Sequence, residues 1–234
     1  MKLFCKHILF LLLSLKLIVL NAQDYRFKHI GKEQGLSQSR VNSIIQDKEG
    51  FLWFATDDGL NKYNGQAIKV YKNDIKNPNS ISDNWINELY LHDDGTIYIG
   101  TLEGGLNVYN KYQDTFKRYT FKENEEKSIS SNNITSIVKK DDNTLWIGTD
   151  NGLNIFDIKS ASFIRINESN SKLPSNQIKC LYQDKNNILW IGTAKHGLFS
   201  YDYINKTFIS HTLKNDAGTY PVHGSNKIRN IFED

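Results

Sequence analysis

The stretch Leu145-Trp146-Ile147-Gly148-Thr149 decides the fold, because the chain contains three more copies of it. These copies are Leu52-Trp53-Phe54-Ala55-Thr56, Ile97-Tyr98-Ile99-Gly100-Thr101 and Leu189-Trp190-Ile191-Gly192-Thr193. Their aromatic residues follow one another at spacings of 45, 48 and 44 residues. A period of this length indicates a chain built from similar supersecondary units.

Turn residues divide each unit into four short segments. In the first unit these segments are residues 41–47, 51–56, 59–64 and 67–72, all rich in aliphatic or aromatic side chains. Gly or Asn precedes each aromatic residue by three positions, and a second Gly precedes the next Leu; both residue types tolerate positive φ. Short runs of this composition are typical of strands. Four-stranded units of about 45 residues predict the antiparallel blades of an all-β propeller.

An aliphatic pair three residues apart begins each unit. The pairs are Val41 and Ile44, Ile86 and Leu89, Ile134 and Ile137, Ile178 and Leu181, and finally Ile228 and Ile231. The segment is too short for a stable helix, and residues three apart in a strand face opposite sides, so we expect a strand packed on both faces. The fifth pair is followed by the end of the sequence. We therefore predict about four and a half blades and an incomplete ring.

A small residue follows the aromatic and aliphatic positions of every unit. It is Ala55, Gly100, Gly148 or Gly192. We interpret this position as a site of close approach by the neighbouring sheet, in preference to a flexible strand end.

Residues 1–22 resemble a secretory signal peptide, with a cationic start, an apolar run at 8–20 and a small-residue end at Ala22. A retained membrane anchor is the alternative, but the run has 13 residues and Lys16 interrupts it, whereas a spanning helix needs ~20. We expect cleavage after Ala22 and export to the periplasm. Residues 23–34 are expected to supply a strand that completes a last blade, and residues 35–234 to hold the repeats.

Loss of the signal peptide makes the protein neutral. Removal of Lys2, Lys6 and Lys16 leaves 26 basic side chains against 26 acidic ones. Without a basic excess, we expect no contact with nucleic acid. The one remaining thiol, Cys180, has no second cysteine to pair with and no metal-ligand spacing, so we expect a buried core residue.

The motif order resembles the two-component regulator propeller repeat over nearly all of residues 35–234. The pattern that carries the resemblance is Ile-x-x-Ile, then Asp-x-x-Gly, then Leu-Trp-Ile-Gly-Thr, then Gly-Leu-Asn; the second unit departs from it with Tyr98 for Trp and with His92 where Asp47 and Asp184 stand. The resemblance implies the periplasmic sensor of a hybrid two-component histidine kinase, anchored in the inner membrane by its parent chain and controlling transcription through a phosphorelay. The residues present contain no nucleotide-binding glycine loop and no helix for a phosphorylated histidine, so kinase activity is expected of the parent chain alone.

No catalytic, metal or cofactor site is expected in these residues. The histidines after residue 22 occur singly, without the spacing that places two metal ligands on one helix face. Acid pairs such as Asp57-Asp58, Asp93-Asp94 and Asp141-Asp142 fall at predicted turns, where carboxylates accept hydrogen bonds from backbone amides.

The loops that join the outer strand of one unit to the inner strand of the next are the candidate ligand site. They should lie at the mouth of the central channel, and each ends in a turn-forming residue, usually Asn, followed by a variable one. The variable residues are Arg40, Trp85, Asn133, Gln177 and Lys227. An aromatic platform surrounded by amides and cations suits a sugar or an anionic sugar polymer; alternatively, Trp85 packs over its own blade. The longer insertion at 212–224 adds Tyr220 and His223 to this rim.

Three functions remain open from the sequence. The chain is a ligand-binding sensor that feeds a kinase, a secreted propeller enzyme that cleaves glycans as a hydrolase or lyase, or a lectin-like scaffold. The expected partners are an oligosaccharide and the further blades and signalling domains of the same parent chain, with a homodimer left open.

Overall fold

The computed structural model describes residues 27–211 and 227–233. The chain divides into a unit of residues 1–30 and a unit of residues 31–234. In the first unit, residues 27–30 form no strand, since no hydrogen-bonded partner strand accompanies them. The predicted signal peptide, the first residues of the expected terminal strand and the insertion at 212–224 lie outside the described residues. No helix in the described part is long and apolar enough to cross a membrane.

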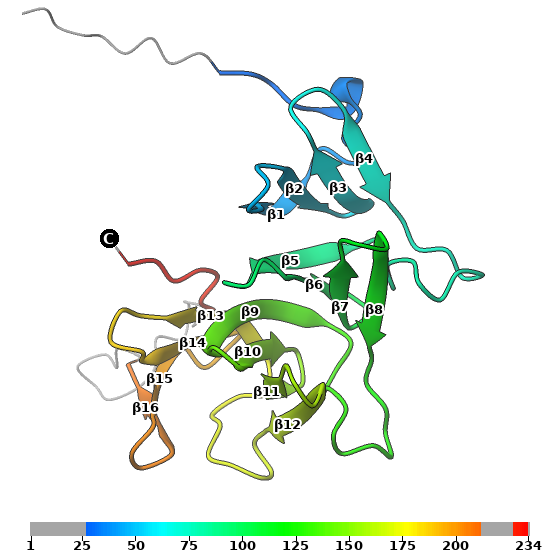
Figure 1. The fold of residues 1–234 in the computed structure, drawn as a ribbon. Coiled ribbons are helices and arrows are strands. Elements are labelled where there is room, and N and C mark those ends of the chain that lie inside the picture. Colours follow the sequence, from blue (N-terminus) through cyan, green and yellow to red (C-terminus); the bar gives the residue numbers. More distant parts are fainter. Residues whose placement is uncertain (1–26, 212–226, 234) are drawn as a thin grey trace, which may run out of the picture. The chain divides into compact units, whose positions relative to one another are not determined.

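The second unit confirms the all-β architecture with four four-stranded antiparallel sheets, each in chain order (Figure 1). The first sheet comprises β1 (Val41–Gln46), β2 (Leu52–Thr56), β3 (Gly59–Tyr63) and β4 (Ile68–Tyr71), and the second comprises β5 (Ile86–Leu91), β6 (Ile97–Thr101), β7 (Leu106–Asn110) and β8 (Thr115–Tyr119). The third comprises β9 (Ile134–Asp141), β10 (Thr144–Thr149), β11 (Gly152–Asp157) and β12 (Ser162–Ile166), and the fourth β13 (Ile178–Gln183), β14 (Leu189–Thr193), β15 (Leu198–Asp202) and β16 (Thr207–Ser210). A short 3-10 helix at Lys32–Gln34 precedes β1.

The first strand of each sheet carries a β-bulge, which places both residues of its aliphatic pair on the same face of the sheet. In β5, Ile86 pairs with Thr101 and Leu89 pairs with Ile99, and the register shifts between them. Because Thr101 and Ile99 are two residues apart on β6, their partners share one face of the sheet. The expectation that residues three apart face opposite sides was therefore wrong, since the bulge adds one residue to the strand.

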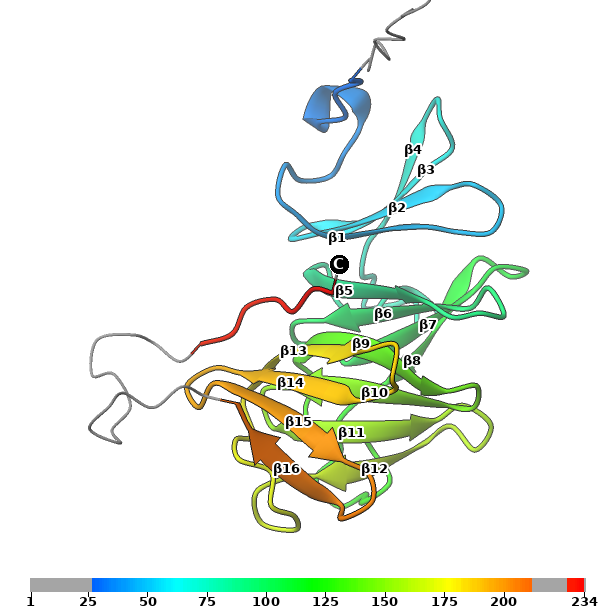
Figure 2. The ribbon, with the colours of Figure 1, turned by 90° about the vertical axis from the view of Figure 1, so that its left-hand side faces the viewer.

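The hydrophobic core lies between consecutive sheets, which follow one another as blades (Figure 2). One core cluster joins Trp53 and Leu60 of the first blade to Ile86 and Leu89 of the second. Two equivalent clusters join the second blade to the third and the third to the fourth. Burying each large side chain of these clusters contributes ~1.5 to 3 kcal/mol, so the faces between blades hold the structure together.

The recurring glycines permit this packing between blades, as predicted. A Cβ atom on Gly148 would lie 2.7 Å from Ile178 Cγ2, a distance that real Cβ atoms essentially never show. Corresponding Cβ atoms on Gly100 and Gly192 would lie 2.5 Å from Ile134 Cγ2 and 2.7 Å from Ile228 Cγ2. In each case the first aliphatic residue of the following unit blocks the Cβ atom, and at Gly192 Cys180 Sγ of the same blade also lies 2.5 Å away. The first residue of the fifth pair, Ile228, therefore packs as its earlier equivalents do.

Cys180 and three of the four repeated aromatic residues, Trp53, Tyr98 and Trp146, are buried, whereas Trp190 is partly exposed. Cys180 is buried, and burial raises the pKa of its thiol to about 11. The indole Nε1 of Trp53 donates a 2.7 Å hydrogen bond to Asp47 Oδ2. In the second blade Tyr98, which has no ring N–H, replaces the tryptophan, and His92 replaces the aspartate. In the second blade, both the donor and the acceptor of this hydrogen bond have therefore been replaced.

Candidate functional site

The five variable loop residues lie at the starts of the inner strands. Four of them directly precede β1, β5, β9 and β13, and the fifth precedes Ile228; the five are Arg40, Trp85, Asn133, Gln177 and Lys227. Strand β1 lies beside β5, β5 beside β9, and β9 beside β13. Within the described residues, no hydrogen bond, ion pair or ring contact joins any two of the five. We call the loops that end in these residues the variable loops.

The asparagines before three of the variable residues, Asn84, Asn132 and Asn176, close their loops and tie them to the preceding blade. Asn84 Oδ1 accepts a 2.7 Å hydrogen bond from the backbone N–H of Asn73, and its carbonyl accepts one of 2.7 Å from Gly59. The same pair of bonds occurs at Asn132, with Phe121 and Gly105, and at Asn176, with Glu168 and Gly152. The glycine is required because its φ is positive, at 128° for Gly59.

An arginine on the outer strand holds the middle of two of these loops. Arg118 Nε donates a 2.7 Å hydrogen bond to the carbonyl of Ser80, and Nη2 donates one of 2.9 Å to that of Asn77. Arg165 makes the equivalent 2.7 Å bond to the carbonyl of Ser128. Charged donors make strong hydrogen bonds, so the loops before Trp85 and Asn133 are firmly positioned.

Trp85 has a fixed backbone and a partly exposed ring. Its N–H donates to Asp83 Oδ1 at 3.2 Å, and its carbonyl accepts a 3.0 Å hydrogen bond from Leu102. Its side chain is 38% exposed, whereas Trp53 and Trp146 in the repeated strand positions are buried. The ring therefore offers an apolar surface to solvent from a rigid support.

Two carboxylates lie next to the variable residues, and the sequence analysis did not include them in the site. Arg40 Nη1 lies 3.6 Å from Asp57 Oδ2, and Asn133 Nδ2 donates a 3.2 Å hydrogen bond to Asp150 Oδ2. Both aspartates follow the threonine that ends the repeated strand, on the β2–β3 and β10–β11 turns. That shared position was the available signal; Asp57 was interpreted only as a turn residue, and Asp150 was not considered. The site is therefore lined by acids as well as by amides and cations.

A cavity of about 470 Å³ lies at one variable loop. Its lining includes Asn133, Asp150, Glu103 and the ring of Phe121, which is 39% exposed. Amide N–H groups can donate hydrogen bonds to hydroxyl groups, and amide and carboxylate oxygens can accept hydrogen bonds from them. The aromatic ring can contact the C–H groups of the same molecule. This chemistry suits binding of a polar, hydroxylated molecule.

The described residues contain no group of three or more His, Cys, Asp or Glu side chains placed to hold a metal ion. Of the acid pairs, Asp94 accepts a 2.8 Å hydrogen bond from the backbone of Thr96, and Asp141 one of 2.9 Å from that of Asn143. These aspartates act as turn caps, in agreement with the interpretation from the sequence.

The comparison with known proteins agrees with the repeat pattern. The family model of the two-component regulator propeller matches residues 35–58, 128–151 and 172–195. Histidine kinase P4 of Formosa agariphila is 45% identical over 75 residues, which make up 32% of this chain and 5% of the kinase.

Solved structures are similar over most of the chain. The extracellular domain of BT3049, a candidate hybrid two-component system of B. thetaiotaomicron, superposes with a TM-score of 0.72 at 32% identity, over 82% of this chain and 28% of that one. The extracellular domain of BT4673 from the same organism gives a TM-score of 0.66 at 26% identity, over 86% and 24%. This chain thus spans about a quarter of each of these structures. The described residues thus form a β-propeller segment, and two-component regulator propeller repeats occupy residues 35–58, 128–151 and 172–195.

Proposed function

We propose that the chain is the exported, periplasmic ligand-sensing region of a hybrid two-component sensor histidine kinase. The similarity to extracellular domains of such systems carries this proposal, and the kinase match supports it. The signal-like residues 1–22 agree with export. Phosphorelay and control of transcription belong to the parent chain.

The proposed ligand is an oligosaccharide bound at the variable loops. Trp85 supplies the aromatic platform, and Arg40, Asn133, Gln177 and Lys227 supply polar groups around it. Asp57 and Asp150 add hydrogen-bond acceptors for sugar hydroxyls. Loops on a rigid scaffold are where binding residues usually lie.

Binding at these loops provides a physical route to a signal. The variable loops before Trp85, Asn133 and Gln177 are each tied to the blade before them and continue into the inner strand of the blade after them. A ligand that contacts several loops favours the arrangement of blades in which all contacts form, and this differential affinity can shift an equilibrium of the parent chain.

The test is calorimetric titration of the protein with xylo-, manno- and galacto-oligosaccharides, followed by variants at two exposed aromatic positions. Trp85→Ala should weaken binding by roughly 2 kcal/mol or more and leave the melting temperature unchanged. Tyr112→Ala is the control, because Tyr112 is 89% exposed and lies outside the variable loops. Unchanged affinity with a lowered melting temperature for Trp85→Ala would show that Trp85 only packs over its blade.

A further inference from the structure

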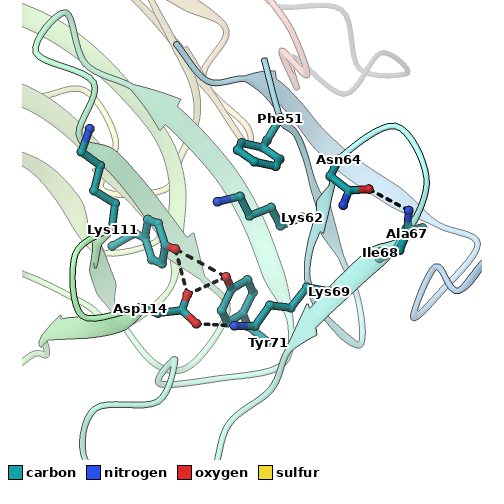
Figure 3. Close-up of a pocket in the computed structure, with 10 residues that line it drawn as sticks. Phe51, Lys62, Asn64, Ala67, Ile68, Lys69, Tyr71, Lys111 and Asp114 are labelled. Carbon is teal, nitrogen blue, oxygen red and sulfur yellow. Dashed lines mark hydrogen bonds and ion pairs between the residues drawn. The ribbon is translucent and has the colours of Figure 1, made fainter. Parts of the chain in front are cut away.

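A second recess lies between the outer hairpin of the first blade and the β7–β8 turn of the second. It encloses about 450 Å³ and is lined by Phe51, Lys62, Lys69, Tyr71, Lys111 and Asp114, among others (Figure 3). None of the five variable residues lines it. Three ammonium groups and a single carboxylate therefore meet in one recess away from the variable loops.

Lys62 departs from the repeat at this recess. It pairs with Trp53 across the sheet, at the position where the second and third blades have Val108 and Ile155. An aliphatic side chain therefore satisfies the packing at this position, and the fold does not require a lysine.

The ammonium of Lys62 lies against aromatic rings and has no ionic partner. Its Nζ is 4.0 Å from the ring centroid of Phe51, 5.0 Å from that of Trp53 and 5.8 Å from that of Tyr109. No carboxylate of the described residues is within ion-pair distance of it. Cation–π contacts stabilise the position of the charge, and in the described part of the chain no side chain or backbone group accepts a hydrogen bond from this partly exposed ammonium.

The carboxylate of Asp114 is already occupied. It accepts hydrogen bonds from Tyr71 Oη at 2.7 Å and Tyr109 Oη at 2.8 Å, and it forms an ion pair with Lys69 (Figure 3). Burial alone raises the pKa of Asp114, but the hydrogen bonds from Lys69 and the two tyrosines outweigh burial and lower it. Asp114 thus fixes the wall of the recess and is not a partner for Lys62.

Asp47 and Glu49, which line an adjacent cavity together with Lys62, are occupied as well. Asp47 accepts hydrogen bonds from the indole of Trp53 at 2.7 Å and from the backbone N–H of Phe51 at 2.9 Å. Glu49 pairs with Lys111 at 3.3 Å, where both side chains are about half exposed. The Glu49 contact is exposed, so an incoming anion can compete with Glu49 for Lys111, which lines the same recess as Lys62.

We propose that this recess binds a small organic anion, with a carboxylate or sulfate group at Lys62 and Lys111 and the rest of the molecule in the recess. Charge-assisted hydrogen bonds from ammonium groups are the strong contacts for such anions. The inference concerns a site separate from the variable loops and does not rest on the function proposed for them.

The experiment is calorimetric titration of the whole chain with digalacturonate, with galactose 6-sulfate and with neutral galactobiose. At least one acidic probe should bind more tightly than galactobiose, and this binding should weaken as salt is raised. The two acidic arms distinguish a carboxylate site from a sulfate site. Equal binding of the neutral and acidic sugars, or no binding of either acidic probe, would overturn the proposal.

Matched lysine variants test whether the acidic probe binds at the recess. Lys62→Met should raise the Kd for the acidic probe by at least about tenfold, because it removes a charged hydrogen bond, and Lys111→Met should raise it to a smaller extent. The control is Lys117→Met, which removes the same charge from a lysine that lies over Tyr119 and outside the recess. Acidic-probe binding that falls equally in the control, or that Trp85→Ala abolishes while Lys62→Met leaves it intact, would refute the assignment.

Discussion

Glu88 on β5 gives the sharpest test of the packing between the first two blades. Burial raises the pKa of its carboxyl to about 7, although hydrogen bonds from Ser43 Oγ and the backbone of Leu89 act in the opposite direction. The folded chain therefore holds the proton more tightly than the unfolded chain, in which the pKa is about 4.5. The neutral carboxyl therefore makes its full contribution to the free energy of unfolding below pH 4.5, and this contribution is lost as the pH rises towards 7.

The substitution Glu88→Gln removes this titration while keeping the size and hydrogen-bonding capacity of the side chain. A difference of about 2.5 pKa units corresponds to about 3 kcal/mol. Relative to the parent chain, the variant should therefore gain about 3 kcal/mol of unfolding free energy between pH 4.5 and pH 8.

The measurement is urea unfolding of both proteins at several pH values, because the difference between them isolates Glu88 from the other titrating groups. Glu123→Gln, the same change at an exposed position, is the control. If the free-energy difference between Glu88→Gln and the parent is the same at pH 4.5 and pH 8, the reasoning about a buried neutral carboxyl is wrong.

Three further predictions concern packing and processing. Gly148→Ala should destabilise the fold by ~1 to 3 kcal/mol through overpacking against Ile178; thermal melting measures this, and trimming Ile178 to Ala in the same chain should recover part of the loss. Trp146→Ala should cost about 3 to 5 kcal/mol, because the side chain is buried, with oligosaccharide affinity unchanged below the melting temperature; a loss of affinity in the folded variant would place Trp146 in the site. The exported protein should begin at Gln23, which mass spectrometry of its N-terminus decides; retention of residues 1–22 would favour a membrane anchor.

The repeat made most of the fold predictable. Each strand position occurs in four units, so the recurrence of glycine at positions 100, 148 and 192 can be recognised as a packing constraint. The strands of the first blade begin and end within one residue of the predicted segments. The bulge in each inner strand was missed, because an aliphatic pair three residues apart gives no indication of whether the strand between them is regular.

The site was less accessible to sequence reasoning. The positions of Trp85 and its equivalents followed from the repeat, and their shared role in binding stays a prediction. Asp57 and Asp150 were missed because each lies 17 residues after the variable residue that it contacts. Only the pairing of strands in the sheet brings the aspartate and the variable residue together. The surroundings of Lys62 depend on Tyr109 from another blade, a contact that no pattern within one unit contains.

The asparagines that close three of the variable loops, Asn84, Asn132 and Asn176, separate loop length from the presentation of the variable residue. The segments closed by Asn84 and Asn132 span 11 residues, and the one closed by Asn176 spans 8. In all three, the same two hydrogen bonds deliver the next residue to the start of an inner strand. Insertions and deletions in these segments therefore leave the start of the inner strand unchanged. Evolution, or a protein engineer, can change the segments and the exposed residue independently of the blades, which makes the scaffold well suited to acquiring new specificities.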